Sequence, residues 1–171
     1  MIKTTPFEMV FIIRDYMDWR FRGEDYACNL RVAGIAVRNG YLLVQREKNG
    51  SEYALPGGHV QIGEIMEDAL VREYWEEIGV RILPKNLIWT EECFWEWNGI
   101  STHTITFYYK IALCGNIEIT TDSFLPHKDN PNIEYGWISI DNLENITIYP
   151  EFMKTKIHNL NQKHQHFITR A

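Results

Sequence analysis

Alternating hydrophobic and polar positions run through the middle of the chain and predict β-strands. The segments RVAGIAV (residues 31–37) and YLLVQR (residues 41–46) are rich in aliphatic side chains and flank Asn39-Gly40. Asn-Gly favours a type I′ turn because both of its residues adopt positive φ readily. The two segments are therefore predicted to pair as a β-hairpin.

One segment shows the period of a helix instead. Its hydrophobic side chains recur at the spacing of one helix face: Val71, Tyr74, Trp75 and Ile78. This pattern predicts a helix over residues 64–78, with that face against the core. Gly79 follows directly, and glycine commonly ends a helix because it adopts the left-handed conformation at little cost.

Shorter segments complete the expected order of elements. The glycine-rich stretch NGSEYALPGGHVQIGE, between the first hairpin and the helix, predicts a loop with one short strand inside it. A second Asn-Gly, at 98–99, predicts another hairpin, and residues 151–162 have a helical pattern. The further strands are expected at residues 53–55, 87–97, 100–113, 134–140 and 166–169.

These elements predict one mixed α/β domain, because strands lie on both sides of a central helix. The chain has 171 residues, 45% of them hydrophobic, which suffices for a single core. The domain is expected to span residues 31–150. Residues 1–30 are expected to be an N-terminal extension that packs on the core, and residues 151–171 a C-terminal helix and tail of the same domain.

Composition limits the classes of function. The charge is 17 − 23 = −6 and no run of Lys or Arg occurs, so binding to extended nucleic acid is not expected. The early apolar run at 9–13 is too short to span a membrane, and no membrane association is expected. Three widely spaced cysteines without a CxxC motif predict reduced thiols and a cytoplasmic protein.

The sequence REYWEEIGV, residues 72–80, contains three glutamates on one predicted helix face: Glu73, Glu76 and Glu77. Like charges at this spacing repel each other and destabilise a helix. They form either a solvated acidic face or, together with a carbonyl of the preceding glycine-rich loop, an oxygen-rich site for Mg²⁺ or Mn²⁺. A divalent cation would remove the repulsion.

The spacing of these residues resembles the box of the Nudix hydrolases, which reads G, five residues, E, seven residues, REUxEExGU, where U is a bulky aliphatic residue. The chain has the expected residue at every fixed position: Gly58, Glu64, Arg72, Glu73, Glu76, Glu77 and Gly79. With roughly one chance in fifteen per position, an accidental match at a given start has a probability on the order of 10⁻⁸. The departure is Tyr74, where the family usually has an aliphatic residue.

The resemblance implies a Nudix-like α/β/α sandwich with a mixed β-sheet. It also implies a hydrolase, dependent on Mg²⁺ or Mn²⁺, that cleaves the diphosphate of a nucleoside diphosphate linked to another group X. The implied metal ligands are the Gly58 carbonyl and the carboxylates of Glu73, Glu76 and Glu77, with Glu76 and Glu77 as the main anchors. The implied role of Glu64 and Arg72 is to shape the loop and helix through charge-assisted hydrogen bonds.

Residues outside the box have open alternatives. Glu134 is the first candidate for the base that activates water, followed by Glu118 and Asp129, and each is otherwise a surface acid. Four residues are candidates for substrate binding: Arg46, His59, Trp95 and Trp97. The alternatives are a surface salt bridge for Arg46, loop packing for His59, and a core or dimer interface for the two tryptophans.

The identity of X is open at this point. Nucleotide sugars, ADP-ribose, nucleoside triphosphates, dinucleoside polyphosphates and capped RNA ends all contain the required diphosphate. A small nucleotide-derived substrate is expected. Two other classes of function remain, a catalytically silent Nudix-fold sensor or interaction module and a domain stabilised by a structural metal ion. The N-terminal extension and the aromatic strand also suggest a homodimer.

Overall fold

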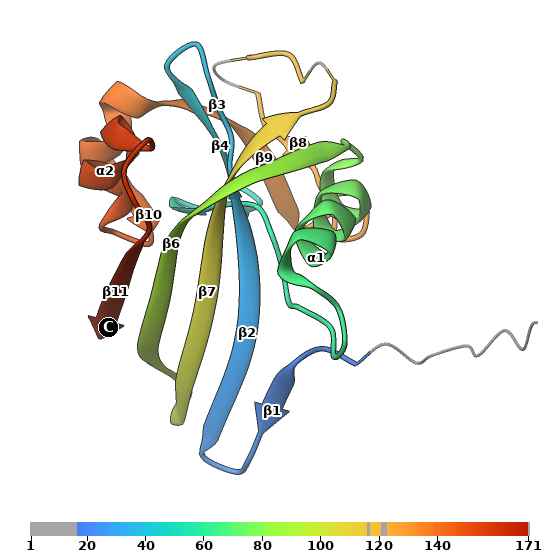
Figure 1. Ribbon diagram of the computed structural model, residues 1–171, viewed down its shortest axis with the longest axis vertical. Coiled ribbons are helices and arrows are strands. Elements are labelled where there is room, and N and C mark those ends of the chain that lie inside the picture. The colour runs from blue at the N-terminus through green and yellow to red at the C-terminus, as the bar shows by residue number, and fades with distance from the viewer. Residues whose placement is uncertain (1–16, 116, 121–122, 171) are drawn as a thin grey trace, which may run out of the picture.

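The structure is a computed structural model that describes residues 17–115, 117–120 and 123–170. Two mixed β-sheets form its centre, and helices flank them on opposite sides (Figure 1). Residues 1–16 and the apolar run predicted within them lie outside the described residues. Within the described part of the chain, no helix is long and apolar enough to cross a membrane.

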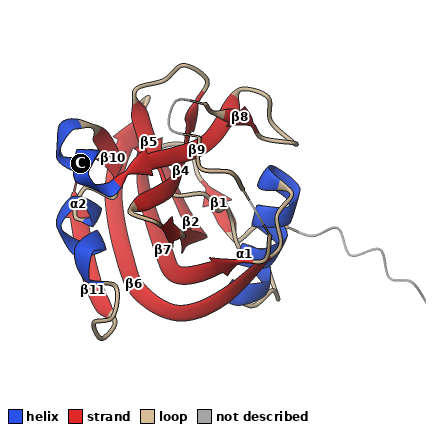
Figure 2. Ribbon diagram, turned by 90° about the horizontal axis from the view of Figure 1, so that it is seen from above, coloured by secondary structure: helices blue, strands red, loops and turns tan. Residues whose placement is uncertain are grey.

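The first sheet has five strands in the order β1-β2-β7-β6-β11. Its strands are β1 (Arg20–Arg22), β2 (Tyr26–Ile35), β6 (Ile82–Trp97), β7 (Ile100–Leu113) and β11 (Gln165–Arg170). β6 and β7 are antiparallel around Asn98-Gly99, whose φ values of 52° and 77° fit the predicted turn. β2 runs parallel to β7, and β11 runs parallel to β6. Figure 2 shows that this sheet is strongly curved.

The second sheet lies across the concave side of the first one (Figure 2). Its main path runs β10-β5-β4-β9-β8, and β3 pairs with β4. Its strands are β3 (Val37–Arg38), β4 (Tyr41–Glu47), β5 (Glu52–Ala54), β8 (Leu125–Pro126), β9 (Ile133–Ser139) and β10 (Thr147–Tyr149). The two sheets and their flanking helices confirm the predicted mixed α/β sandwich.

The first predicted hairpin is only partly correct. The turn exists, since Asn39 and Gly40 have φ values of 51° and 79°, and β3 and β4 are antiparallel on its two sides. Residues 31–35, however, belong to β2 and pair with β7 in the other sheet. The chain passes from one sheet to the other at Ala36, and the local hydrophobic pattern does not show this because the sheet to which a strand belongs is decided by its pairing partners.

The predicted helix over residues 64–78 is shorter at its start and changes type near its end. Glu64 belongs to a turn, because its N–H donates to the Gln61 carbonyl and Gly63 has φ 84°. The α-helix α1 spans Met66–Glu73, and the π-helical turn η1 spans Tyr74–Ile78. The Gly79 N–H donates to the Tyr74 carbonyl, and Gly79 has φ 78°, which confirms the predicted end of the helix.

The predicted apolar face of this helix is wrong in one residue. Tyr74 and Ile78 are buried, but Trp75 is 53% exposed. The buried face is centred on Leu70 and Tyr74, and consecutive helix residues are about 100° apart, so Trp75 turns to solvent. The Tyr74 hydroxyl donates to the Gly34 carbonyl in β2 at 3.0 Å, and a Cβ at Gly34 would overlap this tyrosine. The large residue in the box therefore fits against a glycine.

At the C-terminus the predicted strand is confirmed, and the helix predicted over residues 151–162 is shorter than expected. α2 (Met153–Lys156) continues into the 3₁₀ turn η3 (Ile157–Asn159), and β11 then adds the last strand of the first sheet. Another 3₁₀ turn, η2 (Ile140–Asn145), precedes β10. Met153 and Ile157 are buried in a core cluster with residues of β4 and β6, so the C-terminal segment closes the core on the side opposite α1 (Figure 1).

Candidate active site

The glycine-rich loop lies against β2 at one end of α1. Gly57 has φ 145°, and a Cβ there would overlap the Val32 carbonyl. A Cβ at Gly58 would overlap the carboxylate of Glu73, so this carboxylate lies directly against the loop backbone. The Gly58 carbonyl accepts the Val32 N–H at 3.0 Å and keeps its second lone pair. Both glycines are therefore required by the close approach of neighbouring groups.

Arg72 joins the loop to the helix. Its Nε and Nη2 donate to the two carboxylate oxygens of Glu64, both at 2.9 Å. Its Nη1 donates to Glu73 at 2.7 Å and to Glu76 at 3.1 Å, and Nη2 also reaches the His59 carbonyl at 3.0 Å. The planar guanidinium thus holds three carboxylates and one loop carbonyl at once, which a lysine cannot do.

The charges of this cluster depend on Arg72. Burial works against the ionised Glu64 carboxylate, but hydrogen bonds from Arg72 and the Gln61 N–H lower its pKa below the usual value. The hydrogen bond with Glu64 is the main reason why the pKa of Arg72 is raised. Glu64 and Arg72 therefore form a charged pair that fixes the loop, without requiring a metal ion.

Glu77 lacks such compensation. Burial, together with the charges of Glu73 and Asp129, raises the pKa of Glu77 to about 8, although the Gly57 N–H donates a hydrogen bond to it. Its Oε2 is buried without a hydrogen-bond partner. Burial also raises the pKa of Glu73. The protein alone therefore disfavours the ionised form of Glu77, and a bound cation would stabilise that form.

The loop between β8 and β9 forms the other side of the cluster. The Lys128 N–H donates to the Glu77 carbonyl at 2.8 Å, which fixes the loop on η1. His127 is buried, and its Nδ1 lies 3.9 Å from both Glu77 Oε1 and Asp129 Oδ1. Burial lowers the pKa of His127, although Asp129 opposes this effect. The structure therefore brings Asp129, one of the candidate bases, next to Glu77.

The oxygen donors of the box fit a hard divalent cation. Carboxylate and carbonyl oxygens are the ligands that Mg²⁺ prefers, and the unpartnered Glu77 oxygen lies among them. Within residues 17–170, gaps excluded, no three His, Cys, Asp or Glu side chains converge closely enough to form a complete metal site. Glu73 and Glu76 are instead held by Arg72.

Glu134 and Arg46 pair with each other. Glu134 Oε1 accepts from Arg46 Nε at 2.8 Å, between β9 and β4. Arg46 also donates to the Gly50 carbonyl and the Tyr53 hydroxyl, and its guanidinium stacks over Phe124 at 4.0 Å. The structure therefore shows the salt bridge that was the alternative for Arg46, and Glu134 contacts this arginine rather than a carboxylate of the box.

Two other candidates take different positions. Glu118 is exposed and lines a surface depression with Arg38 and Ile117. His59 is half-buried, pairs with Arg31 through its backbone, and accepts a hydrogen bond from Arg72 at its carbonyl. Burial, with a contribution from Arg31, lowers the pKa of His59 to about 4, so its ring is neutral at neutral pH. His59 thus adjoins the box, and Glu118 does not contact it.

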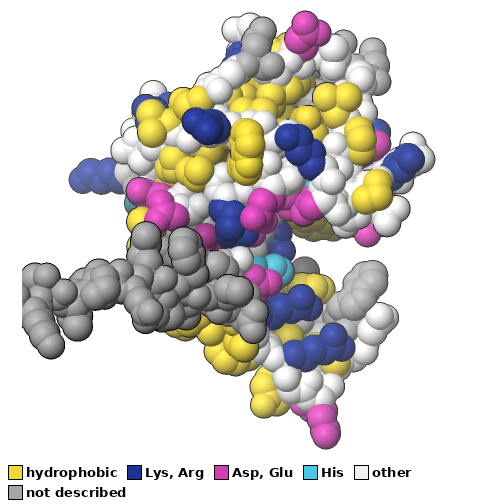
Figure 3. Space-filling model, turned by 90° about the vertical axis from the view of Figure 1, so that its right-hand side faces the viewer, with side chains coloured by type: hydrophobic (Ala, Val, Ile, Leu, Met, Phe, Trp, Pro, Cys, Tyr) yellow, Lys and Arg dark blue, Asp and Glu magenta, His cyan; other side chains and the backbone are white. Residues whose placement is uncertain are grey.

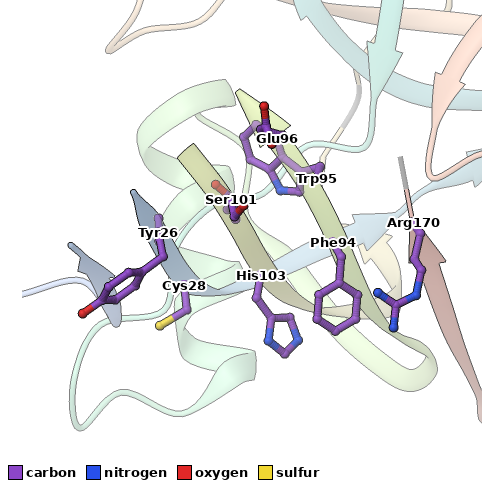
Figure 4. Close-up of a pocket in the computed structure, with 10 residues that line it drawn as sticks. Tyr26, Cys28, Phe94, Trp95, Glu96, Ser101, His103 and Arg170 are labelled. Atoms are coloured by element: carbon purple, nitrogen blue, oxygen red, sulfur yellow. The ribbon is translucent and has the colours of Figure 1, made fainter. Parts of the chain in front are cut away.

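Trp95 lies far along β6, near the Asn98-Gly99 turn at the lower end of the first sheet in Figure 1. Its indole N–H donates to Thr104 at 3.1 Å. Figure 4 shows the pocket at this end of the sheet, where Phe94, His103 and Arg170 also lie. The register confirms that Trp95 and Phe94 face opposite sides. The side chain of Trp97 lies outside the described part of the structure.

Sequence reasoning missed three residues beside the box. Arg31 donates to the Gly57 carbonyl at 3.2 Å, and His127 and Lys128 contact Glu77 as described above. His127 and Lys128 lie in the stretch LPHKDNPN, whose prolines and asparagines predict only a loop. Its position is set by the pairing of β8 with β9, which a local pattern cannot show.

The face that carries α1 is shown in Figure 3. Acidic and basic side chains form a band across its middle, between areas rich in hydrophobic side chains, and the surface is indented at one end of this band. This distribution fits a site for a polar ligand on an otherwise mixed surface. The band is consistent with the ion-pair network around Arg72.

Two curated relatives match part of the chain. A MutT-like protein of Streptomyces ambofaciens is 40% identical over 55 residues, which are 32% of this chain and 36% of the relative. An ADP-ribose pyrophosphatase of Methanocaldococcus jannaschii is 47% identical over 49 residues, which are 28% of each chain. The chain thus aligns with about a third of the length of these relatives or less.

Solved structures and a family model match most of the chain. The mutator MutT protein of Bacillus halodurans superposes with a TM-score of 0.59, over 82% of this chain and 89% of its own, at 20% identity. This likeness shows a shared fold. A sequence model of the family described as the NUDIX domain matches residues 29–160, which confirms the resemblance found in the box. The chain belongs to the NUDIX domain family.

Proposed function

We propose that the protein is a Mg²⁺- or Mn²⁺-dependent hydrolase that cleaves the diphosphate of a nucleoside diphosphate linked to a group X. The observation that carries this proposal is the largely buried carboxyl group of Glu77, whose ionisation the protein alone does not stabilise. This carboxylate is largely buried, lies beside Glu73 and Asp129, and has one oxygen without a partner. An acidic cluster arranged in this way is costly unless a cation binds to it.

We assign two roles to the box residues, metal binding and positioning of the metal ligands. The Gly58 carbonyl, Glu73, Glu76 and Glu77 supply the oxygen donors for the cation. Arg72 and Glu64 keep the glycine loop against the helix so that these donors stay together. When bound, the divalent ion neutralises negative charge that develops on the phosphoryl oxygens and helps to orient water.

We assign the base that activates water to Asp129. Its carboxylate is 54% exposed, so it can reach a water molecule, and its charge acts directly on Glu77. Glu134 is paired with Arg46, which favours a structural role for both residues. Glu118 lines a separate surface depression together with Arg38 and Ile117. An Asp129→Asn variant is expected to lose kcat with little change in metal affinity, since Asp129 is not among the proposed ligands.

The substrate is proposed to be a small nucleotide-derived molecule. The negative net charge disfavours long nucleic acids, and the partial relatives carry the names MutT-like protein and ADP-ribose pyrophosphatase. His59 adjoins the box and supports the substrate side of the loop, while Trp95 and Trp97 would serve only a substrate long enough to reach the far end of β6.

We place the enzyme in the cytoplasm, where its three free thiols would stay reduced. A homodimer is part of the same proposal, and light scattering tests it.

A hydrolysis screen tests the proposal. Purified protein with Mg²⁺ or Mn²⁺ is incubated with nucleotide sugars, ADP-ribose, nucleoside triphosphates and dinucleoside polyphosphates, and products are separated by chromatography. Glu77→Gln is the matched control, since it removes the charge and keeps the shape. Turnover by the wild type that is lost in Glu77→Gln supports the enzyme. Saturable nucleotide binding without turnover would instead support the alternative, a catalytically silent sensor.

A further inference from the structure

An exposed tryptophan lies within the box itself. Trp75 occupies the variable position between Tyr74 and Glu76, on η1, and 53% of its surface is exposed. It borders a depression of about 500 Å³ that also touches Glu64 and Arg72. The depression therefore adjoins the proposed reaction site from the outer side of the helix. The ring of Trp75 is thus accessible to a ligand that occupies this depression.

Two cations reach the same indole ring. The Arg81 guanidinium carbon lies 5.7 Å from the ring centre, and Lys128 Nζ lies 5.2 Å from it. They come from different elements, since Arg81 directly precedes β6 and Lys128 belongs to the loop after β8. Both positive charges therefore lie within about 6 Å of the centre of one aromatic ring beside the box, where cation–π attraction holds them.

Neither cation is neutralised. Among the residues that the structure describes, Arg81 and Lys128 form no ion pair with a carboxylate. The Lys128 side chain lies over Gly79, where a Cβ would overlap its amine. Two exposed, unpaired cations in a protein of charge −6 are available for an external anion.

We propose that Arg81 and Lys128, held by Trp75, bind a phosphate group of the substrate that lies outside the diphosphate at the box. A guanidinium binds two phosphate oxygens in a fixed geometry, and an ammonium adds an adaptable point charge. This proposal rests on the proposed function and narrows it. It favours substrates with at least three phosphates, such as nucleoside triphosphates or dinucleoside polyphosphates, over nucleotide sugars.

A binding experiment tests the subsite without relying on turnover. Inorganic tripolyphosphate is titrated by calorimetry into the metal-free wild type, into Arg81→Gln/Lys128→Gln, and into a control with the same loss of charge. The control is Lys156→Gln/Arg170→Gln, because these cations also lie over aromatic rings, Phe167 and Phe94, but on strands and helices away from the box.

The expected result is specific to the proposed subsite. The Kd for tripolyphosphate should rise about tenfold or more in the Arg81/Lys128 variant, which loses two charged contacts, and stay within about twofold of the wild type in the control. Equal weakening in both variants would show attraction by net charge alone. An unchanged Kd in the first variant, or no binding by the wild type, would also overturn the subsite.

Kinetics separate this proposal from the proposed function. With Mg²⁺, the ratio of kcat/KM for a nucleoside triphosphate to that for a nucleotide sugar should fall about tenfold in Arg81→Gln/Lys128→Gln, through KM rather than kcat. Turnover of nucleotide sugars alone, without tripolyphosphate binding, would overturn the subsite and leave the hydrolase intact. If tripolyphosphate binding depends on Arg81 and Lys128 but no compound is turned over, the hydrolase proposal is wrong and the subsite proposal stands.

Discussion

The carboxylates of Glu77 and Glu91 are both largely shielded from solvent, but they differ in their hydrogen-bond partners. Glu91, on β6, is 4% exposed and accepts hydrogen bonds from the Tyr108 hydroxyl at 2.7 Å and from Thr169 at 2.6 Å. Each of its oxygens thus has a donor. Glu77, on η1, has one oxygen without a partner and lies among other acids. The fold thus supplies hydrogen-bond donors to both carboxylate oxygens of Glu91 but not to both oxygens of Glu77.

This difference is the reason why we propose a structural role for Glu91 and a functional role for Glu77. Buried polar groups in proteins nearly always have hydrogen-bond partners, so an unsatisfied one calls for an explanation. Glu91 links β6, β7 and β11 through neutral hydroxyl groups and needs nothing else. Glu77 keeps an acceptor free at the point where the box places its other oxygen donors. The proposed cation would give the free oxygen of Glu77 a partner, as the two hydroxyl groups do for the oxygens of Glu91.

Activity should distinguish the two residues most strongly. Glu77→Gln is expected to lower kcat by about three orders of magnitude, since a catalytic cation contributes several kcal/mol to the transition state. Glu91→Gln should keep kcat within about twofold, because its neighbours are structural. Steady-state kinetics on the substrate found in the screen measure both. A similar loss of kcat in the two variants would contradict the comparison.

Metal binding should stabilise the protein through Glu77. At a free Mg²⁺ concentration of about 100 Kd, a single site adds about 2.7 kcal/mol to the free energy of unfolding. Thermal unfolding with Mg²⁺ and with a chelator measures this gain in the wild type, in Glu77→Gln and in Glu91→Gln. We expect the gain to be kept in Glu91→Gln and mostly lost in Glu77→Gln, and the reverse order would reject the assignment of the metal site.

The same measurement has a defined pH dependence. The folded protein without metal holds a proton on Glu77 up to a pKa of about 8, whereas the unfolded chain releases it near the ordinary pKa of 4.5. The unfolded state therefore binds fewer protons between these values, and the contribution of Glu77 to stability falls as pH rises through this window. Stabilisation by Mg²⁺ should be larger at pH 8 than at pH 5, and Glu77→Gln should remove the difference.

Removal of the Glu91 side chain should act on stability instead. Glu91→Ala leaves the buried Tyr108 hydroxyl without its acceptor and is expected to lower the free energy of unfolding by about 3 kcal/mol. Glu77→Ala removes a carboxyl group that has one oxygen without a partner, and it should cost less in the absence of metal. Urea unfolding with a chelator present compares the two. A larger cost for Glu77→Ala would show that Glu77 is needed for the fold itself.

The sequence was sufficient for the box and for most strands. The spacing from Gly58 to Gly79 is local, so the resemblance to the family could be read from the sequence, and the metal-binding role of its glutamates stays a prediction that this resemblance implies. The Asn39-Gly40 and Asn98-Gly99 turns were also predictable, because they depend on residues that adopt positive φ. Local patterns are reliable where the structure is determined by neighbours in the chain.

Other features depend on contacts that are distant in sequence. The crossing of the chain between sheets at Ala36 is set by the pairing of β2 with β7. The exposure of Trp75 follows from the way Tyr74 fits against Gly34, and His127 reaches Glu77 only because β8 pairs with β9. No single segment contains this information, so the pairing partners of strands and the second side of the site required the structure.

The two hydroxyl donors of Glu91 give the finest test of the comparison. Tyr108 is buried, so Tyr108→Phe leaves a carboxylate oxygen that water cannot reach, and the expected cost is about 1.5 kcal/mol of unfolding free energy. Thr169 is half-buried on the edge strand β11, where water can replace its hydroxyl, so Thr169→Val should cost less than about 1 kcal/mol. Urea unfolding of the two single variants and of the double variant measures both costs and their coupling. If neither change lowers stability, Glu91 is not satisfied by these hydroxyl groups, and its contrast with Glu77 loses its basis.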